Sequence, residues 1–297
     1  MTALSAPQPS VRFVLRSGRS IAADAYGDPD ATPVLFLHGG GQTRHAWAGS
    51  AEALARLGFY TITMDHRGHG DSDWAPQGHY SIDDFARDLI EVVGKLREKP
   101  VVVGASLGGL SVLAAEQISA EPVARAVVLV DISPRMELVG VQRIVDFMRA
   151  DGDGFSSLED AAEAIAAYTP HRKRDKNLAG LAKNLRRGED GRYRWHWDPD
   201  LLEFWDPEQR GREDHDEATV HRRLEDAGRI DAPMLLIRGR MSDVLSEDAA
   251  AEFRRFVPKA EFIDLADAAH MIAGDRNDAF TDSVARFILD HTKGPRS

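Results

Sequence analysis

Residues 101–110 read VVVGASLGGL, and the organisation of the whole chain follows from this stretch. The three valines form an uninterrupted apolar run, which is typical of a strand buried on both faces of a parallel sheet. The letters GASLG at 104–108 follow directly and lead into a helical pattern. A serine flanked in this way, between a strand and a helix, matches a sharp turn that exposes a nucleophile at the carboxyl edge of the sheet. Ser106 is therefore the predicted nucleophile.

Apolar runs and helical patterns alternate on both sides of this stretch. Residues 11–27 predict an antiparallel hairpin with a Ser-Gly turn. The remaining patterns predict strands at 33–37, 60–64, 100–103, 126–130, 233–237 and 261–265, and helices at 47–57, 82–96 and 279–290, besides the helix after Ser106. This alternation predicts an α/β fold with a mostly parallel, doubly wound sheet and helices on both faces.

The alternation of strand and helix patterns stops between about 133 and 230. Only helical periodicity is evident there, near 137–150, 157–168, 174–186 and 217–227. We therefore expect a core formed by 1–132 and 231–297, with a helical cap at 133–230 inserted after the sixth strand. A chain of 297 residues accommodates this as one elaborated domain.

Composition limits the functions open to the chain. The 48 acidic and 37 basic residues give a formal net charge of −11, which disfavours binding to nucleic acid or to anionic membranes. The absence of cysteine excludes disulfides, thiolate metal sites and a cysteine nucleophile. No leader pattern and no apolar stretch of membrane-spanning length is evident, so we expect a cytoplasmic protein without membrane insertion. The sequence does not decide between a monomer and a homodimer.

A serine nucleophile needs a base, and the chain has eleven histidines. His270 follows the last predicted strand, at the same sheet edge as Ser106, and is the predicted base. His66 and His69 have a spacing that metal ligands also show. They lie in a glycine-rich loop without a third convergent ligand, so a metal site is disfavoured.

The base in turn needs a carboxylate that fixes its tautomer and stabilises its cation. Asp243 lies on the loop after the predicted strand 233–237, and the order Ser, Asp, His agrees with one of the known triad orders. Asp131, at the end of strand 126–130, is the main alternative, and Asp248 is a weaker one.

Negative charge that develops on an attacked carbonyl oxygen is best met by fixed backbone donors. The loop 37–42 reads LHGGGQ and follows a predicted strand. The N–H groups of Gly40 and Leu107 are the predicted oxyanion donors. A phosphate-binding loop is disfavoured because no Lys-Ser/Thr pair follows the glycines.

Five ordered motifs, spread over nearly the whole chain, carry a resemblance to a known family. They are LFLHGGG at 35–41, DHRGHGDSD at 65–73, GASLGG at 104–109, LIRGRMSDVLS at 236–246 and AAHMIAGD at 268–275. The chain resembles the α/β-hydrolase superfamily, in particular its capped members, which include carboxylesterases, carbon–carbon bond hydrolases, cofactor-free haloperoxidases and epoxide hydrolases. The resemblance implies a mainly structural role for 65–73.

Two departures from the family refine the expectation. Epoxide hydrolases and haloalkane dehalogenases of this family carry an aspartate at the nucleophile position, so Ser106 disfavours both activities. Ala269 stands where the family commonly has glycine before the histidine; alanine fits there unless a positive φ is needed.

The resemblance and the candidate triad together predict a serine hydrolase that acts through an acyl-enzyme. Its small-molecule substrate would be largely hydrophobic and contain a carboxylester, thioester or lactone bond, and no metal or organic cofactor is expected. Activity should fall below roughly pH 6 to 7, where a histidine base becomes protonated. A carbon–carbon hydrolase, a haloperoxidase-like perhydrolase and a slow-turnover receptor-type binding protein are the alternatives.

Aromatic residues are concentrated in the expected cap. They either line the substrate pocket or form the small core of the cap itself, and the sequence does not separate the two roles. The candidate pocket residues are Gly41, Trp47, Phe147, Tyr168, Trp195, Trp197 and Trp205.

Overall fold

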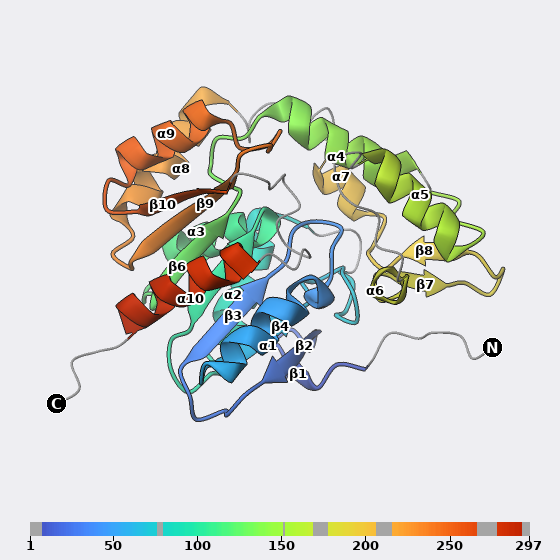
Figure 1. Cartoon of the computed structure of the whole chain (residues 1–297), viewed down its shortest axis with the longest axis horizontal. Helices are drawn as coiled ribbons and strands as arrows, with labels where there is room; N and C mark the ends of the chain where they lie inside the picture. Colours follow the sequence, from blue (N-terminus) through green and yellow to red (C-terminus); the bar gives the residue numbers. More distant parts are fainter. Residues whose placement is uncertain are drawn as a thin grey trace.

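The computed structural model describes residues 8–75, 80–150, 152–168, 178–205, 216–265 and 278–292. Within these residues the centre is an eight-stranded sheet with the spatial order β1-β2-β4-β3-β5-β6-β9-β10 (Figure 1). Its strands are β1 (Val11–Val14), β2 (Ser20–Tyr26), β3 (Pro33–Leu37), β4 (Tyr60–Met64), β5 (Val101–Ala105), β6 (Ala126–Val130), β9 (Met234–Gly239) and β10 (Glu261–Leu265).

The sheet is parallel from β4 to β10, and only β1 and β2 run antiparallel to their neighbours. Every residue of β3, β5, β6 and β9 is buried, because apolar side chains project into helical layers on both faces. The predicted strands and the N-terminal hairpin are confirmed, with end points that differ by at most two residues.

Helices cover both faces of the sheet. On one face lie α1 (Ala48–Arg56) and α10 (Asp278–Thr292), whose Leu54 and Phe280 share a buried cluster with the strands. The other face carries α2 (Ile82–Val93), α3 (Leu107–Ile118), α8 (Glu217–Arg229) and α9 (Glu247–Phe256). None of the helices in the described ranges has the length and apolarity needed to cross a bilayer.

The insertion between β6 and α8 projects to one side of the sheet (Figure 1). It contains α4 (Leu138–Ala150), α5 (Leu158–Tyr168), α6 (Ala179–Ala182), β7 (Leu185–Arg187), β8 (Tyr193–Trp195) and α7 (Leu201–Trp205). The helix predicted at 174–186 is wrong over its described part, since α6 is short and β7 pairs antiparallel with β8. The Gly188 N–H donates to the Arg192 carbonyl at 2.8 Å, and Gly191 has φ +81°, so the chain closes a turn that ends helical periodicity.

Helix α8 lies within the range expected for the cap, 133–230, but packs against core helices. Val220 and Leu224 belong to the same buried cluster as Val112 of α3 and Phe253 of α9. In Figure 1, α8 lies beside α9 at the β9–β10 end of the sheet. The apolar stripe of α8 is therefore buried by the core.

Candidate active site

The chain passes from β5 into α3 at Ser106, which adopts φ 46° and ψ −114°. This strained conformation is rare for a residue other than glycine. The flanking glycines make the turn sterically feasible: a Cβ at Gly104 would lie 2.5 Å from the carbonyl carbon of Gly108, and one at Gly108 would lie 2.6 Å from the Cβ of Leu37. Ser106 is left partly exposed, while the residues on either side are buried.

The loop after β3 passes directly over Ser106. A Cβ at Gly39 would lie 3.4 Å from the Ser106 Cβ. The Gly39 N–H donates to Gln42 Oε1 at 3.0 Å, and the Gln42 N–H donates to the Gly39 carbonyl at 3.1 Å. Gly41 has φ +74° and donates its N–H to His69 Nε2 at 3.1 Å. These bonds give the glycine-rich loop one defined shape.

Two N–H groups beside Ser106 have no acceptor within the described part of the chain. One belongs to Gly40, whose neighbours in the loop both donate to acceptors. The other belongs to Leu107, the first residue of α3, where no intrahelical acceptor exists. Both were predicted from the sequence as oxyanion donors, and that role stays a prediction.

Asp131 directly follows β6, the strand that pairs with β5 just before Ser106. The Ser106 N–H donates to the carbonyl of Val130 at 3.3 Å, so Asp131, the next residue, lies beside the turn at Ser106. Asp131 is fully buried, with φ +54°. Its carboxylate accepts hydrogen bonds from the Gly239 N–H at 2.8 Å and from Ser242 Oγ at 2.5 Å. A buried, hydrogen-bonded carboxylate thus organises the turn after β9.

Asp243 lies further along the same turn, in a different environment. Its Oδ2 accepts a hydrogen bond from Arg143 Nη1 of α4 at 2.9 Å, and the two side chains are 37% and 51% exposed. Arg143 also donates to the carbonyl of Tyr168 at 2.6 Å and stacks on its ring, 5.1 Å from the centroid. Asp243 therefore forms a half-exposed ion pair with the cap.

The predicted base, His270, lies outside the described residues, as does the side chain of Trp205. The contact between base and acid therefore stays a prediction.

Three buried histidines gather behind the loop over Ser106. His66 and His69, in the loop after β4, lie with ring centroids 4.7 Å and 4.9 Å from that of His38. Burial lowers the pKa of His66 to about 3 and that of His69 to about 4. The Nε2 atoms of His38 and His69 accept backbone N–H groups, so neither is open to a metal. Within the described residues no group of three or more histidine or acidic side chains could hold an ion.

A buried ionic cluster, which the sequence did not predict, supports these loops. Arg44 is fully buried and donates to Asp65 at 2.6 Å, to Asp71 at 2.7 Å and to Asp24 at 2.9 Å. Burial raises the pKa of Asp65 to about 6, and Arg44 keeps its carboxyl ionised at neutral pH. Three segments distant in sequence meet here, so no local pattern identifies Arg44.

A sequence family described as the alpha/beta hydrolase fold matches residues 32–276. The chain belongs to this family. The match covers the nucleophile turn, the loop over it and the insertion, so the resemblance inferred from five motifs is confirmed. The chain is thus a hydrolase of this fold.

Two characterised relatives align over most of their length. The esterase Rv0045c of Mycobacterium tuberculosis is 28% identical over 300 residues, which cover 97% of this chain and 91% of the relative. The 3-hydroxybutyrate-oligomer hydrolase of Cupriavidus necator is 27% identical over 261 residues, 84% of this chain and 86% of the relative.

Solved structures agree on the architecture. The structure of E-2-(acetamidomethylene)succinate hydrolase superposes with a TM-score of 0.80 at 22% identity, over 95% of this chain and 100% of the other. At that identity it supports the fold alone. A structure of the M. tuberculosis esterase superposes with a TM-score of 0.73 at 27% identity, over 96% and 93% of the two chains.

In this α/β hydrolase, helix α4 spans the site. Near its start, a Cβ at Gly140 would lie 2.0 Å from the backbone oxygen of Asp243, so the helix packs closely on the turn after β9. Near its end, the side chain of Met148 lies against Gly41, 3.2 Å from where a Cβ would be. The helix thus connects the acidic side of the site to the loop over Ser106.

The aromatic residues of the cap divide between two clusters. Trp197 is 7% exposed and packs with Met148 and Leu107, the residue after the nucleophile, with Phe147 at the cluster's edge. Phe155 belongs to a separate small core of the cap. Trp195 touches both clusters, and Tyr168 stacks on Phe147 with ring centroids 4.4 Å apart. A role in the core of the cap is therefore observed for Phe155, and pocket lining by the other rings stays a prediction.

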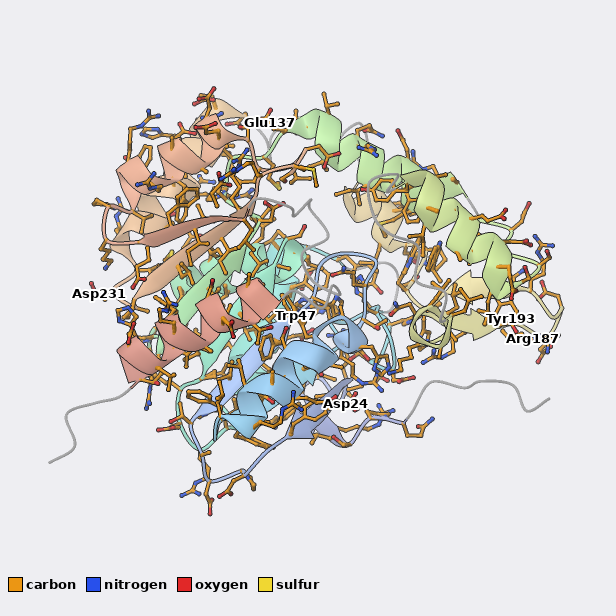
Figure 2. All side chains as sticks on the ribbon, viewed as in Figure 1. Asp24, Trp47, Glu137, Arg187, Tyr193 and Asp231 are labelled. Carbon is orange, nitrogen blue, oxygen red and sulfur yellow. The ribbon has the colours of Figure 1, made fainter. Side chains whose placement is uncertain are left out.

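Trp47 lies in the body of the protein and not with the cap. Its ring is 1% exposed and stacks on Phe280 of α10 at 5.5 Å, with Phe36 of β3 at 5.3 Å on another side. Figure 2 labels Trp47 close to α10, far from Tyr193 on the β7–β8 hairpin. Helix-to-sheet packing accounts for Trp47, so its assignment to the pocket is not supported.

Proposed function

We propose that this α/β hydrolase is a serine esterase that cleaves a carboxylester, thioester or lactone bond in a small, largely hydrophobic substrate. The observation that carries the proposal is the strained Ser106 with the N–H groups of Gly40 and Leu107 beside it, neither donating to an acceptor in the described chain. A nucleophile and two convergent donors are the parts that acyl transfer requires.

The reaction proceeds in two balanced steps. Ser106 Oγ attacks the carbonyl carbon while its proton passes to His270, and the carbonyl oxygen takes up the negative charge between Gly40 and Leu107. The tetrahedral intermediate then collapses, and the leaving alcohol or thiol takes the proton from His270. Water next attacks the acyl-enzyme by the same route, which releases the acid and restores the Ser106 hydroxyl.

For the carboxylate that orients the base, the position on the loop after β9 favours Asp243 whereas burial favours Asp131. A triad acid works from a buried, hydrogen-bonded position. Asp131 has this environment, while Asp243 is 37% exposed and already neutralises Arg143. We therefore propose Asp131 as the acid and keep Asp243 as the alternative that the variants below separate.

The apolar side chains next to Leu107 support a hydrophobic acyl group. Met148, Trp197 and Phe147 approach the first turn of α3 from the cap. Burial of an acyl chain there would contribute roughly 25 cal/mol for each Å² removed from water. The names of the two relatives, an esterase and an oligoester hydrolase, agree with ester cleavage.

The test is a panel of aryl and alkyl esters, thioesters, lactones and vinylogous diketones, assayed with and without peroxide. We expect ester hydrolysis by the wild type and its loss in Ser106→Ala. Ser111→Ala is the matched control, because Ser111 is buried and its hydroxyl donates to the carbonyl of Leu107. A phosphonate ester should label the peptide that contains Ser106.

Three outcomes would overturn the proposal. Full activity in Ser106→Ala would show that Ser106 is not the nucleophile. Turnover of diketones alone would indicate a carbon–carbon hydrolase. A burst of one acyl group per protein without further turnover indicates a receptor-type protein.

A further inference from the structure

His69 supplies an acceptor for the loop that carries Gly40, hereafter the oxyanion loop (residues 39–42). The bond runs from the Gly41 N–H to His69 Nε2 at 3.1 Å and joins two segments 28 residues apart. His69 is fully buried, so no water can replace it from outside. The nucleophilic mechanism itself assigns no role to this histidine.

The hydrogen bonds of His69 define its tautomer. Its Nδ1 lies 3.0 Å from the carbonyl of Arg67, and a carbonyl only accepts, so Nδ1 carries the proton. Nε2 is then unprotonated and free to accept from Gly41. Burial lowers the pKa of His69 to about 4, which keeps the ring neutral at physiological pH.

This bond fixes one of two successive peptide planes in the oxyanion loop. The plane between Gly39 and Gly40 is held by its carbonyl, which accepts from His38 Nδ1 at 2.8 Å and from the Gln42 N–H at 3.1 Å. Because the peptide is planar and trans, the Gly40 N–H points the opposite way. The plane between Gly40 and Gly41 is held by His69. Glycines resist rotation least of all residues, so both planes need external partners.

The cap holds His69 in place through the residues on either side of it. The Asp198 N–H donates to the carbonyl of Gly68, and the Gly70 N–H donates to the carbonyl of His196, both at 2.7 Å. His69 itself forms an antiparallel bridge with Trp197. The His69 imidazole is therefore held between the cap and the oxyanion loop.

We infer that His69 is a positioning residue for transition-state stabilisation. It accepts the Gly41 N–H in its neutral form and fixes the peptide plane between Gly40 and Gly41. This plane adjoins the one that carries the Gly40 N–H, so His69 limits rotation about Gly40 and helps to keep that N–H directed at the developing oxyanion. The inference rests on the proposed esterase function. It adds that the oxyanion donor depends on an imidazole that never touches substrate.

The test compares His69→Phe, which removes the acceptor, with His69→Gln, whose side-chain oxygen can accept from Gly41. Removal of one oxyanion donor typically lowers kcat about 10²- to 10³-fold, so we expect His69→Phe to lower kcat by roughly 10- to 100-fold with KM within about twofold. Affinity for an alkyl boronic acid, a transition-state analogue, should fall in parallel. His69→Gln should recover most of both losses.

His66→Phe is the matched control for packing. His66 is 1% exposed, belongs to the same cluster, and its Nε2 has no partner among the described residues. The His66→Phe variant should lower thermal stability as much as His69→Phe does. It should leave the ratio of boronate affinity to substrate affinity unchanged. Equal effects of the two Phe variants on that ratio, or no recovery in His69→Gln, would overturn the inference.

A measurement on the unaltered protein covers the case in which the Phe variants do not fold. Nitrogen NMR of isotope-labelled histidine, assigned with His69→Gln, should show His69 neutral with its proton on Nδ1. A proton on Nε2 would rule the inference out. Such a result leaves the proposed function intact, since that depends on the Ser106→Ala experiment.

Discussion

The two sides of Ser106 carry opposite kinds of titratable group. On the side of β3 and β4, the groups near the nucleophile are three buried histidines, whose pKa values burial lowers: His38, His66 and His69. On the side of β6 and β9, they are two carboxylates, Asp131 and Asp243. On the first side the neutral rings of His38 and His69 hold the loop that carries the Gly40 N–H, and the second side presents negative charge.

This asymmetry matches the charges that acyl transfer creates. In the proposed mechanism an oxyanion forms towards the loop after β3, where fixed N–H dipoles would stabilise it. An imidazolium forms on the proposed base, which follows β10, and is stabilised by a carboxylate at the neighbouring strand ends. An unpaired negative charge on the first side or an unpaired positive charge on the second would oppose the reaction. The comparison predicts at which residues a substitution that changes charge should have the largest effect.

The largest expected effect separates the two carboxylates. Asp131→Asn should lower kcat by roughly 10³- to 10⁴-fold, since replacing a triad aspartate by asparagine leaves the base in the wrong tautomer. Asp243→Asn should lower it by less than about tenfold, because its charge serves an exposed ion pair. Steady-state kinetics of the two variants, with circular dichroism to verify folding, tests this order. The reverse order would make Asp243 the acid.

The next effect concerns the ionic cluster behind the histidines. Arg44→Met leaves Asp65 buried without its cation, which should lower the free energy of unfolding by about 3–5 kcal/mol. Arg56→Met is the control, since the Arg56–Glu52 pair is exposed and should contribute less than about 1 kcal/mol. Urea unfolding monitored by fluorescence measures both. Similar losses in the two variants would mean that the cluster does not support this side of the site.

A smaller effect appears in the pH dependence of stability. The pKa of His66 is about 3 in the folded protein, below its ordinary value, so the unfolded chain binds more protons below pH 6.5. Its contribution to stability is complete above that pH and is lost as the pH falls. His66→Phe should therefore flatten the slope of unfolding free energy by up to about 1.4 kcal/mol per pH unit between roughly pH 6 and 4. An unchanged slope would show that His66 is protonated in the folded state.

The smallest effect is expected at the ion pair between cap and core. Arg143→Gln should change the free energy of unfolding by at most about 1 kcal/mol and kcat by less than about threefold, because the pair is half exposed. Urea unfolding and a pH profile of kcat/KM are the measurements. A shift of the acidic limb of that profile would show that Asp243 influences the protonation of the base. The contrast between the two carboxylates would then be weaker.

The sequence by itself determined the α/β fold and the position of Ser106 in the turn between β5 and α3. The strands are apolar on both faces, so their burial is visible as uninterrupted runs, and the GASLG turn at 104–108 needs glycines that touch other backbone. It also singled out Gly40 and Leu107 as candidate donors, because each lies next to a strand end or a helix start.

Only the tertiary structure decided which polar groups meet. Arg44 with its three carboxylates, and His69 with Gly41, join segments that no local pattern connects. The environments of Asp131 and Asp243 likewise depend on which strand and which cap helix lie next to them, although both residues follow a strand in the sequence. Burial and partner choice are properties of packing between distant elements, whereas secondary-structure period is a property of neighbours along the chain.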